Sequence, residues 1–332
     1  MKRILTLFLA LALTLSLAAC AAPGEKADDG RLQIVATLFP YYDFARAIAD
    51  GRADVTLLLS PGREAHSFEP TPLDAVTISE ADVFLYNGGE GEYWVEEMLD
   101  AAGEHIAVKA RMMDYVDALG EEFSEGMQGA DEHGHDHDHD DHDHDHEEDE
   151  HDSDEIEYDE HIWTSPKNAA ILCRAVCEAI CKADPANEDF YRANCNDYCA
   201  QIEALDARFA DLCESAPRKL LIFADRFPML YFCREYGLDY RAAFHGCSGD
   251  TEPSLATIKF LIDKVEDENI PVVYTIDFGT KKVAAVVSEC TGAAIETIYS
   301  MQTVSRADFD AGETYLTLME RNFEALRKGL NE

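Results

Sequence analysis

The sequence predicts an α/β protein of two lobes, each with a parallel sheet, joined by a long helix. Short apolar runs at 32–37, 54–59 and 82–86 alternate with stretches of helical periodicity, which is typical of a parallel α/β layer. A second series of the same kind begins near residue 219. Between the two series, residues 187–214 keep a helical pattern without Gly or Pro, enough for a spine helix of about 40 Å. We therefore expect two Rossmann-like lobes and a ligand site in the cleft between them.

These patterns also predict the boundaries of the lobes. The N-terminal lobe is expected at 31–183, the linking helix at 184–216 and the C-terminal lobe at 217–332. Residues 120–160 interrupt the first lobe with a low-complexity sequence, which we expect to be a disordered insertion.

Residues 1–20 have the features of an export signal. Lys2 and Arg3 precede a run of 14 apolar residues, 4–17, which is too short to span a bilayer comfortably. The small residues before Cys20 resemble a bacterial lipobox, which implies that Cys20 is the first mature residue and carries a lipid; an ordinary signal peptide with a chance cysteine is the alternative. Residues 21–30 are small and polar and are expected to be a tether. We expect a protein anchored by its lipid to the extracytoplasmic face of the cell membrane.

The net charge of −40 is extreme but unevenly distributed. Much of it comes from residues 131–160, which are rich in Asp and Glu and contain no Lys or Arg. A nucleic acid requires a basic surface, so binding to nucleic acid is disfavoured.

Histidine is the most informative residue type, because eight of the twelve histidines lie in the acidic insertion. These eight are His133, His135, His137, His139, His142, His144, His146 and His151. Imidazoles and carboxylates are the usual ligands of zinc and related ions. A flexible run of both binds several ions weakly, but the entropic cost of ordering it opposes a fixed geometry. The sequence therefore predicts metal binding here, as an accessory collector beside a tighter site.

Two other histidines follow patterns that suggest single metal ligands. His66 lies in the segment 62–72, after a strand and before a helix, with Phe and Pro following it. His161 lies in 160–166, with Trp and Pro following it. These segments resemble the first and second ligand segments of the zinc- and manganese-type solute-binding proteins of bacterial ABC importers. The two lobes, the spine helix, the lipobox and the place of the insertion match that family as well.

The resemblance implies a receptor that captures Zn²⁺ and delivers it to an ABC permease and its ATPase, with His66 and His161 as ligands. It implies a monomeric binding protein and not an enzyme. The insertion favours zinc, although a manganese or iron receptor of the same architecture and a surface adhesin with the same fold remain open. A zinc hydrolase is disfavoured because the sequence has no HExxH or GxSxG motif.

The second lobe departs from the family pattern. The usual third ligand falls on Ala224 or beside it, and Asp225 is the nearest carboxylate. The usual last ligand is an Asp near the end of the final strand, where this chain has no carboxylate at 298–301; Asp277, at the end of the preceding strand, is a possible helper. His245, on a Gly-containing loop, is another candidate. We therefore expect a zinc site formed by His66, His161, Asp225 and His245.

Cysteines repeat at helical spacing in two places. Cys173, Cys177 and Cys181 share one face of an expected helix, and Cys195 and Cys199 repeat the step of four residues. Neighbours along one helix cannot form a disulfide with each other. The favoured interpretation is that these are small buried apolar residues, and disulfides between helices are the alternative.

Overall fold

The computed structural model describes residues 30–65, 67–102, 105–128, 157–249 and 252–331. The chain divides into two compact units, Met1–Arg31 and Leu32–Glu332, and the account below concerns the second. The predicted signal peptide, Cys20, His66 and the eight histidines of the insertion lie outside the described residues. In the described part of the chain, no helix combines the length and apolar character that a membrane crossing requires.

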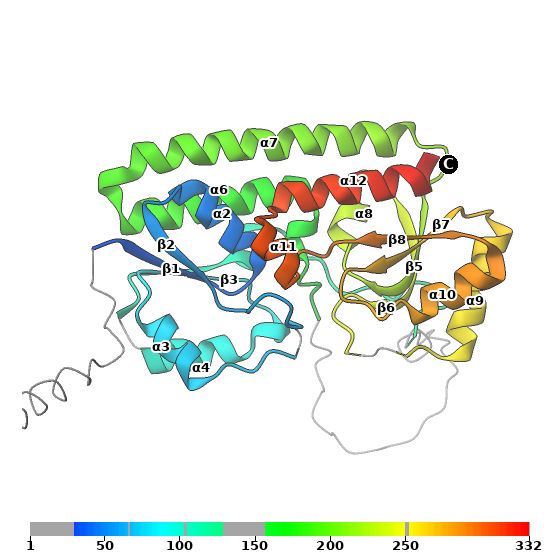
Figure 1. Cartoon of the computed structure of the whole chain (residues 1–332), viewed down its shortest axis with the longest axis horizontal. Helices are drawn as coiled ribbons and strands as arrows, with labels where there is room; N and C mark the ends of the chain where they lie inside the picture. Colours follow the sequence, from blue (N-terminus) through cyan, green and yellow to red (C-terminus); the bar gives the residue numbers. More distant parts are fainter. Residues whose placement is uncertain (1–29, 66, 103–104, 129–156, 250–251, 332) are drawn as a thin grey trace, which may run out of the picture. The chain divides into compact units, whose positions relative to one another are not determined.

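The N-terminal lobe contains a four-stranded parallel sheet with strand order β2-β1-β3-β4 (Figure 1). Its strands are β1 (Leu32–Ala36), β2 (Ala53–Leu57), β3 (Val83–Tyr86) and β4 (Val108–Arg111). Its helices are α2 (Phe39–Ala49), α3 (Pro72–Ser79) and α4 (Trp94–Ala102). Thr71 and Asp74 form a reciprocal capping box that fixes the start of α3, close to the start expected from the sequence.

The C-terminal lobe repeats this arrangement with a parallel sheet of order β6-β5-β7-β8 (Figure 1). Its strands are β5 (Leu220–Phe227), β6 (Asp239–His245), β7 (Val272–Ile276) and β8 (Ala294–Ile298). Its helices are α8 (Leu230–Tyr236), α9 (Leu255–Asp267), α10 (Lys282–Thr291) and α11 (Arg306–Ala311). The prediction of two α/β lobes with parallel sheets is confirmed.

Three long helices lie along one side of both sheets: α6 (Pro166–Ala183), α7 (Glu188–Ser215) and α12 (Tyr315–Asn331) (Figure 1). The spine helix α7 has 28 residues and begins after a short turn at Pro185–Asn187. Its bounds lie within one residue of the helical pattern expected at 187–214 and inside the predicted linking segment 184–216. It packs against α6 and α2 of the first lobe and against α12 and α8 of the second. The apolar core is continuous through these helices and includes buried aromatic rings from both lobes, such as Phe44, Phe209 and Phe232.

A buried carboxylate joins three of these helices. Asp43 of α2 is 1% exposed and accepts hydrogen bonds from the Tyr198 hydroxyl on α7 (2.5 Å) and from the Tyr315 N–H at the start of α12 (2.9 Å). The Arg46 guanidinium donates to its other oxygen (2.8 Å). A buried charge is tolerated only when its hydrogen bonds are made, so this residue fixes α2, the spine and the C-terminal helix together.

The two ends of the expected insertion lie side by side. The Asp159 N–H donates to the Leu119 carbonyl (2.9 Å), and the Glu121 N–H donates to the Glu157 carbonyl (2.8 Å). These bonds flank an antiparallel bridge between Gly120 and Tyr158. A short ladder therefore joins residues 119–121 to residues 157–159.

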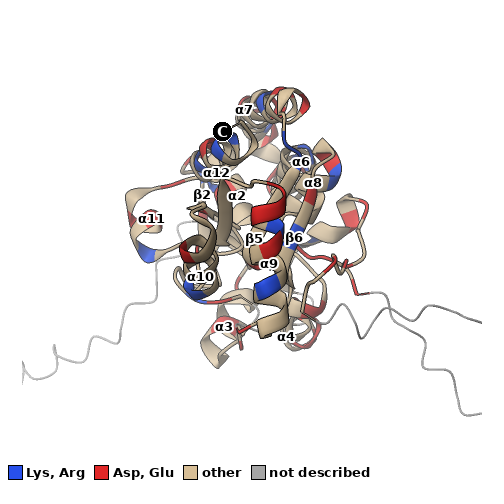
Figure 2. Cartoon of the chain, turned by 90° about the vertical axis from the view of Figure 1, so that its right-hand side faces the viewer, with Lys and Arg blue, Asp and Glu red and all other residues tan. Residues whose placement is uncertain are grey.

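Residues 122–128 continue from this ladder to the C-terminal lobe. The Gln128 N–H donates to the Ala243 carbonyl of β6 (3.0 Å). Glu125 forms ion pairs with Arg241 (3.5 Å) and with Lys264 of α9 (3.7 Å). Figure 2, which looks onto this lobe, shows α9 with acidic and basic residues mixed along it. The prediction placed the start of a disordered insertion at 120, whereas residues 120–128 and 157–160 have defined contacts within the fold.

We predict that Asp43→Ala lowers the free energy of unfolding by about 3 kcal/mol, because it leaves the buried Tyr198 hydroxyl and Tyr315 N–H without an acceptor. Chemical denaturation followed by circular dichroism measures the change. Asp197→Ala is the matched control, because Asp197 lies on α7 beside Tyr198 but is exposed; its effect should stay within about 0.5 kcal/mol. Equal effects of the two substitutions would contradict the role assigned to Asp43.

Candidate metal centre

The segment 159–165 is buried between the two lobes. No side chain in it is more than 4% exposed, although most of its residues are polar. Asn87 of the first lobe donates to the Glu160 carbonyl (3.0 Å), and the Tyr231 hydroxyl of the second lobe donates to the Asp159 carbonyl (2.8 Å). Buried backbone groups require partners, so contacts with both lobes fix the position of this segment.

Trp163 also connects the segment 159–165 to the second lobe. Its indole N–H donates to the Ser300 carbonyl after β8 (2.7 Å), and its own carbonyl accepts from the Tyr315 hydroxyl (2.9 Å). The ring is fully buried and meets Tyr41 edge-on, with centroids 6.2 Å apart. His161, two residues before Trp163, is therefore held at the buried boundary between the two lobes, which is called the seam below, and does not lie on a free loop.

His161 is oriented by Asp159. Its Nδ1 lies 3.2 Å from Asp159 Oδ1, and the same oxygen accepts the backbone N–H of His161 (2.8 Å). Burial lowers the pKa of His161, but the Asp159 carboxylate, with smaller contributions from Glu121 and Glu160, raises it above the usual value. A carboxylate on one ring nitrogen fixes the tautomer and the orientation of the ring, which is the arrangement that supports metal-ligating histidines.

His245, the last residue of β6, is oriented in the same way. Its Nδ1 lies 2.5 Å from Oε2 of Glu121, which belongs to the ladder below the insertion. Burial lowers the pKa of His245, but the hydrogen bond and charge of Glu121 raise it overall. The structure thus brings His161 and His245 to the same seam, each with a carboxylate on Nδ1.

Gly246 explains how the two histidines approach each other. A Cβ atom at this position would lie 2.9 Å from the Phe227 carbonyl, 3.1 Å from His161 Nδ1 and 3.2 Å from Asp159 Oδ2. These distances leave no room for a side chain, so the loop after β6 can rest against the His161–Asp159 pair only with glycine here.

The region carries more negative than positive charge. Cys247 follows Gly246, and its N–H donates to Glu121 Oε1 (3.2 Å). Burial, together with the charges of Asp159, Glu121 and Glu160, raises the pKa of the Cys247 thiol well above its usual value. Three carboxylates, two imidazoles and a thiol near one seam form a donor set that suits a cation of the zinc type.

Asp225 has other partners. Its Oδ2 accepts from the Thr275 hydroxyl (2.6 Å) and from the Ile276 N–H (3.3 Å) of the neighbouring strand β7. It lies where the pairing of β5 with β6 is irregular, between Phe223 and Arg226. Ala224, the usual ligand position of the family, is buried in the apolar core of this lobe. These contacts favour a structural role for Asp225.

An ion pair connects the two lobes beside the expected ligand loop. Both terminal nitrogens of Arg226 reach the carboxylate of Glu64, at 3.3 and 3.1 Å. Glu64 also contributes to the raised pKa of Asp277, which is about 7 mainly because of burial. Asp277 lies directly after β7 and accepts the Ser300 N–H (3.2 Å). The loop that precedes residue 66 therefore reaches the second lobe through Glu64, which pairs with the Arg226 guanidinium and lies near the Asp277 carboxyl group.

A cavity of about 20 Å³ lies on the other side of this loop. Ala65 and Phe68 line it together with Glu92 and Glu160. Its volume is enough for about one water molecule. Burial raises the pKa of Glu92 to about 7, and its Oε1 has no hydrogen-bond partner among the described residues. Two buried carboxyl groups therefore line the cavity beside Ala65 and Phe68.

Sequence analysis missed Glu121, Asp159 and Cys247. Glu121 and Asp159 stand at the two edges of the acidic insertion and were grouped with it, although their spacing on either side of the His-rich run was a usable signal. Among the described residues, the only group of three ligand atoms all within 4.8 Å of one another is a set of cysteines elsewhere. The two histidine–carboxylate pairs are therefore near each other without forming a closed site on their own.

Two parallel α/β lobes joined by a spine helix, with histidine–carboxylate pairs at their seam, define the class of two-lobed metal-binding receptors. The family profile described as "ZnuA: Zinc-uptake complex component A periplasmic" matches residues 34–329. The chain belongs to this family, which consists of solute-binding receptors and not of enzymes.

Relatives of known name agree with this assignment. The chain is 32% identical over 328 residues to the high-affinity zinc uptake system protein ZnuA of Bacillus subtilis (strain 168), covering 98% of this chain and 97% of that protein. It is 29% identical over 329 residues to the zinc-binding lipoprotein AdcA of Streptococcus pneumoniae, covering 99% of this chain and 61% of AdcA. The chain therefore spans about three fifths of that longer relative.

Solved structures show the same fold. The Zn(II)-bound ZnuA-like domain of Streptococcus pneumoniae AdcA superposes with a TM-score of 0.71 at 25% identity, covering 91% of this chain and all of that domain. The metal-dependent lipoprotein YcdH of Bacillus subtilis gives 0.72 at 28% identity, covering 90% of this chain and 99% of that one.

We predict that Glu92 makes the metal-free protein less stable as the pH rises. A carboxyl group whose folded pKa is raised from 4.5 to about 7 contributes stability below pH 4.5 that is lost as the pH approaches 7. Glu92→Gln should therefore gain stability relative to the wild type between pH 4.5 and 8, by up to about 3 kcal/mol. Denaturant titrations at several pH values measure this difference. The exposed neighbour Glu90 provides the control Glu90→Gln. A difference between Glu92→Gln and the wild type that does not change with pH would contradict this account.

Proposed function

We propose that this protein is an extracytoplasmic receptor that captures Zn²⁺ at the seam of its lobes and delivers it to an ABC importer. The observation that carries the proposal is the buried His161, held between the lobes with its Nδ1 oriented by the Asp159 carboxylate, as in metal-ligating histidines. Membership of the ZnuA family supports zinc as the transported ion. The names of the relatives, a zinc uptake protein and a zinc-binding lipoprotein, agree with it.

The proposed ligands are His66 and His161 from the first lobe and His245 from the second. His245 is the better placed of the two second-lobe candidates, because its Nδ1 is oriented by Glu121 while the Asp225 carboxylate is engaged by β7. Asp225 remains in the proposal as the alternative. Zinc accepts three protein ligands and a water molecule when a site must stay open for exchange, and a transported ion must leave.

The insertion is proposed to be an accessory collector. Its eight histidines lie outside the described residues, but its two ends are held by the ladder that also supplies Glu121 and Asp159. The insertion is therefore connected in sequence to the residues that orient His245 and His161. The proposal gives the insertion a role in capture and not in the tight site.

The remaining expectations complete the proposal. Lipidation of Cys20 would keep the receptor at the outer face of the cell membrane, where the loaded protein would dock as a monomer on a permease with its ATPase. These partners follow from the kind of system to which the family belongs.

We predict that one tight zinc site survives deletion of residues 129–154 and is lost in the double variant His66→Ala/His161→Ala. The reason is that the tight ligands lie outside the insertion. Competitive titration with a zinc chelator, combined with native mass spectrometry, measures affinity and stoichiometry. The double variant should lose affinity by at least about 100-fold, while the deletion should lose only weakly bound ions. Loss of all tight binding in the deletion alone would refute the proposal.

We also predict that His245→Ala weakens zinc binding by at least about 10-fold, with little change in the melting temperature of the metal-free protein. Asp225→Asn should have the opposite profile, because it disturbs the contacts with Thr275 and Ile276 and leaves the proposed ligands in place. Calorimetric titration with zinc and thermal unfolding of the same preparations separate the two effects. If Asp225→Asn weakens binding and His245→Ala does not, the second-lobe ligand is Asp225.

A further inference from the structure

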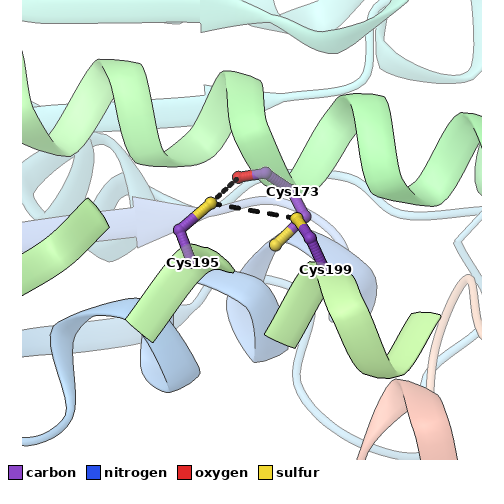
Figure 3. A group of neighbouring side chains, drawn as sticks. All are labelled: Cys173, Cys195 and Cys199. Atoms are coloured by element: carbon purple, nitrogen blue, oxygen red, sulfur yellow. Dashed lines mark hydrogen bonds between the residues drawn. The ribbon is translucent and has the colours of Figure 1, made fainter. Parts of the chain in front are cut away.

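A group of buried thiols lies between α6 and α7 and contains none of the proposed zinc ligands. Cys173 of α6 and Cys195 and Cys199 of α7 place their sulfur atoms within 4.8 Å of one another (Figure 3). Their exposed fractions are 0%, 3% and 1%. The three side chains converge between the two helices in Figure 3.

The spacing of the sulfur atoms is close to that of a thiolate site. The Sγ atoms of Cys195 and Cys199 are 3.9 Å apart. A metal ion bound at about 2.3 Å to three sulfurs separates them by roughly 3.8 to 4.0 Å. The remaining sulfur would need to approach by less than about 1 Å, which a small side-chain rotation supplies.

The thiols have only weak partners in the metal-free state. Cys195 Sγ donates to the Cys173 carbonyl at 3.9 Å, and Cys199 Sγ donates to the Ala170 carbonyl at 3.7 Å. Contacts with Cys195 and Cys199, together with burial, hold the pKa of the Cys173 thiol well above its usual value. Contacts with Cys173, Cys177 and Cys199 instead lower the pKa of the Cys195 thiol. A bound cation deprotonates its cysteine ligands, and the protons are released to solvent.

A disulfide joins two cysteines, whereas this group contains three thiols that are all close to one another. Cys195 and Cys199 are successive turns of one helix and cannot bridge to each other. A bridge from Cys173 to either one would leave the third thiol buried beside it. All nine cysteines of the described part of the chain are free thiols.

We propose that Cys173, Cys195 and Cys199 form a second metal site, a buried trithiolate for the soft cation Cu(I). On binding, three S–H bonds break, three S–Cu bonds form and three protons leave to solvent, with no change in oxidation state. Soft thiolate ligands select Cu(I) over harder ions. Zinc prefers four ligands, whereas this group offers three sulfur atoms. The proposal does not depend on the zinc site at the seam.

Anaerobic titration of the full mature chain with Cu(I), against a Cu(I)-specific chelator, tests it. We expect one Cu(I) per chain with thiolate-to-copper charge-transfer absorption in the near ultraviolet, a signature that the histidines of the insertion cannot produce. The melting temperature should rise on loading, because the ion binds only the folded α6–α7 pair. Cys195→Ser and Cys199→Ser should each abolish the absorption and weaken binding by at least about 100-fold.

The matched control is Cys213→Ser, which replaces another buried cysteine of α7 outside the group and should retain both signals. Circular dichroism of each variant without metal shows whether it folds, and His161→Ala, which keeps all three thiols, should retain the absorption. Absence of the absorption in the wild type, or its persistence in Cys195→Ser, would overturn the proposal. So would a disulfide between Cys173 and Cys195 or Cys199, detected by peptide mapping of the freshly isolated protein, or a zinc complex that requires Cys177 as a fourth thiolate.

Discussion

Burial of the segment 159–165 between the two lobes is the constraint on which the functional region depends. This stretch carries polar side chains and backbone groups into a place that water does not reach, so each group needs a protein partner. Asn87, Tyr231 and the carbonyl of Ser300 supply partners from both sheets. Contacts with both lobes therefore hold His161 in place, and the position of one lobe relative to the other determines which side chains surround it.

The second consequence concerns the His-rich insertion. Its ends are joined by the ladder that carries Glu121 and Asp159, and these two carboxylates orient His245 and His161. The His-rich insertion is therefore joined to Glu121 and Asp159. These two carboxylates orient His245 and His161, the best placed of the proposed ligands. Pairing an imidazole with a carboxylate fixes its tautomer and increases its basicity, which strengthens the bond to a metal. The proposed collector and the proposed tight site are thus connected through one structural element.

The seam is also electrostatically prepared for a cation. Burial raises the pKa of Glu92 and of Asp277 to about 7, so each carboxyl group carries a proton for part of the time near neutral pH. The Arg226–Glu64 ion pair bridges the lobes in the same region. A divalent ion at the seam would replace protons and favour the charged carboxylates. The buried thiols between α6 and α7 follow a different chemistry, because the group consists of three soft sulfur atoms.

By itself the sequence determined the fold class, because the alternation of apolar runs with helical periodicity is recognised in short stretches of sequence without knowledge of the tertiary contacts. It also singled out His161, through the pattern around it, and the metal character of the insertion, through its composition. It could not determine what faces His161, since Glu121, His245 and Cys247 reach the seam only through the crossing of 122–128 and the turn at Gly246. Asp225 shows the same limit. Its position in the sequence suggested a metal ligand, but in the fold its carboxylate accepts hydrogen bonds from Thr275 and Ile276 of β7. Contacts between residues more than a hundred positions apart are decided by how the sheets and the spine pack, because only packing brings their side chains within a few ångströms.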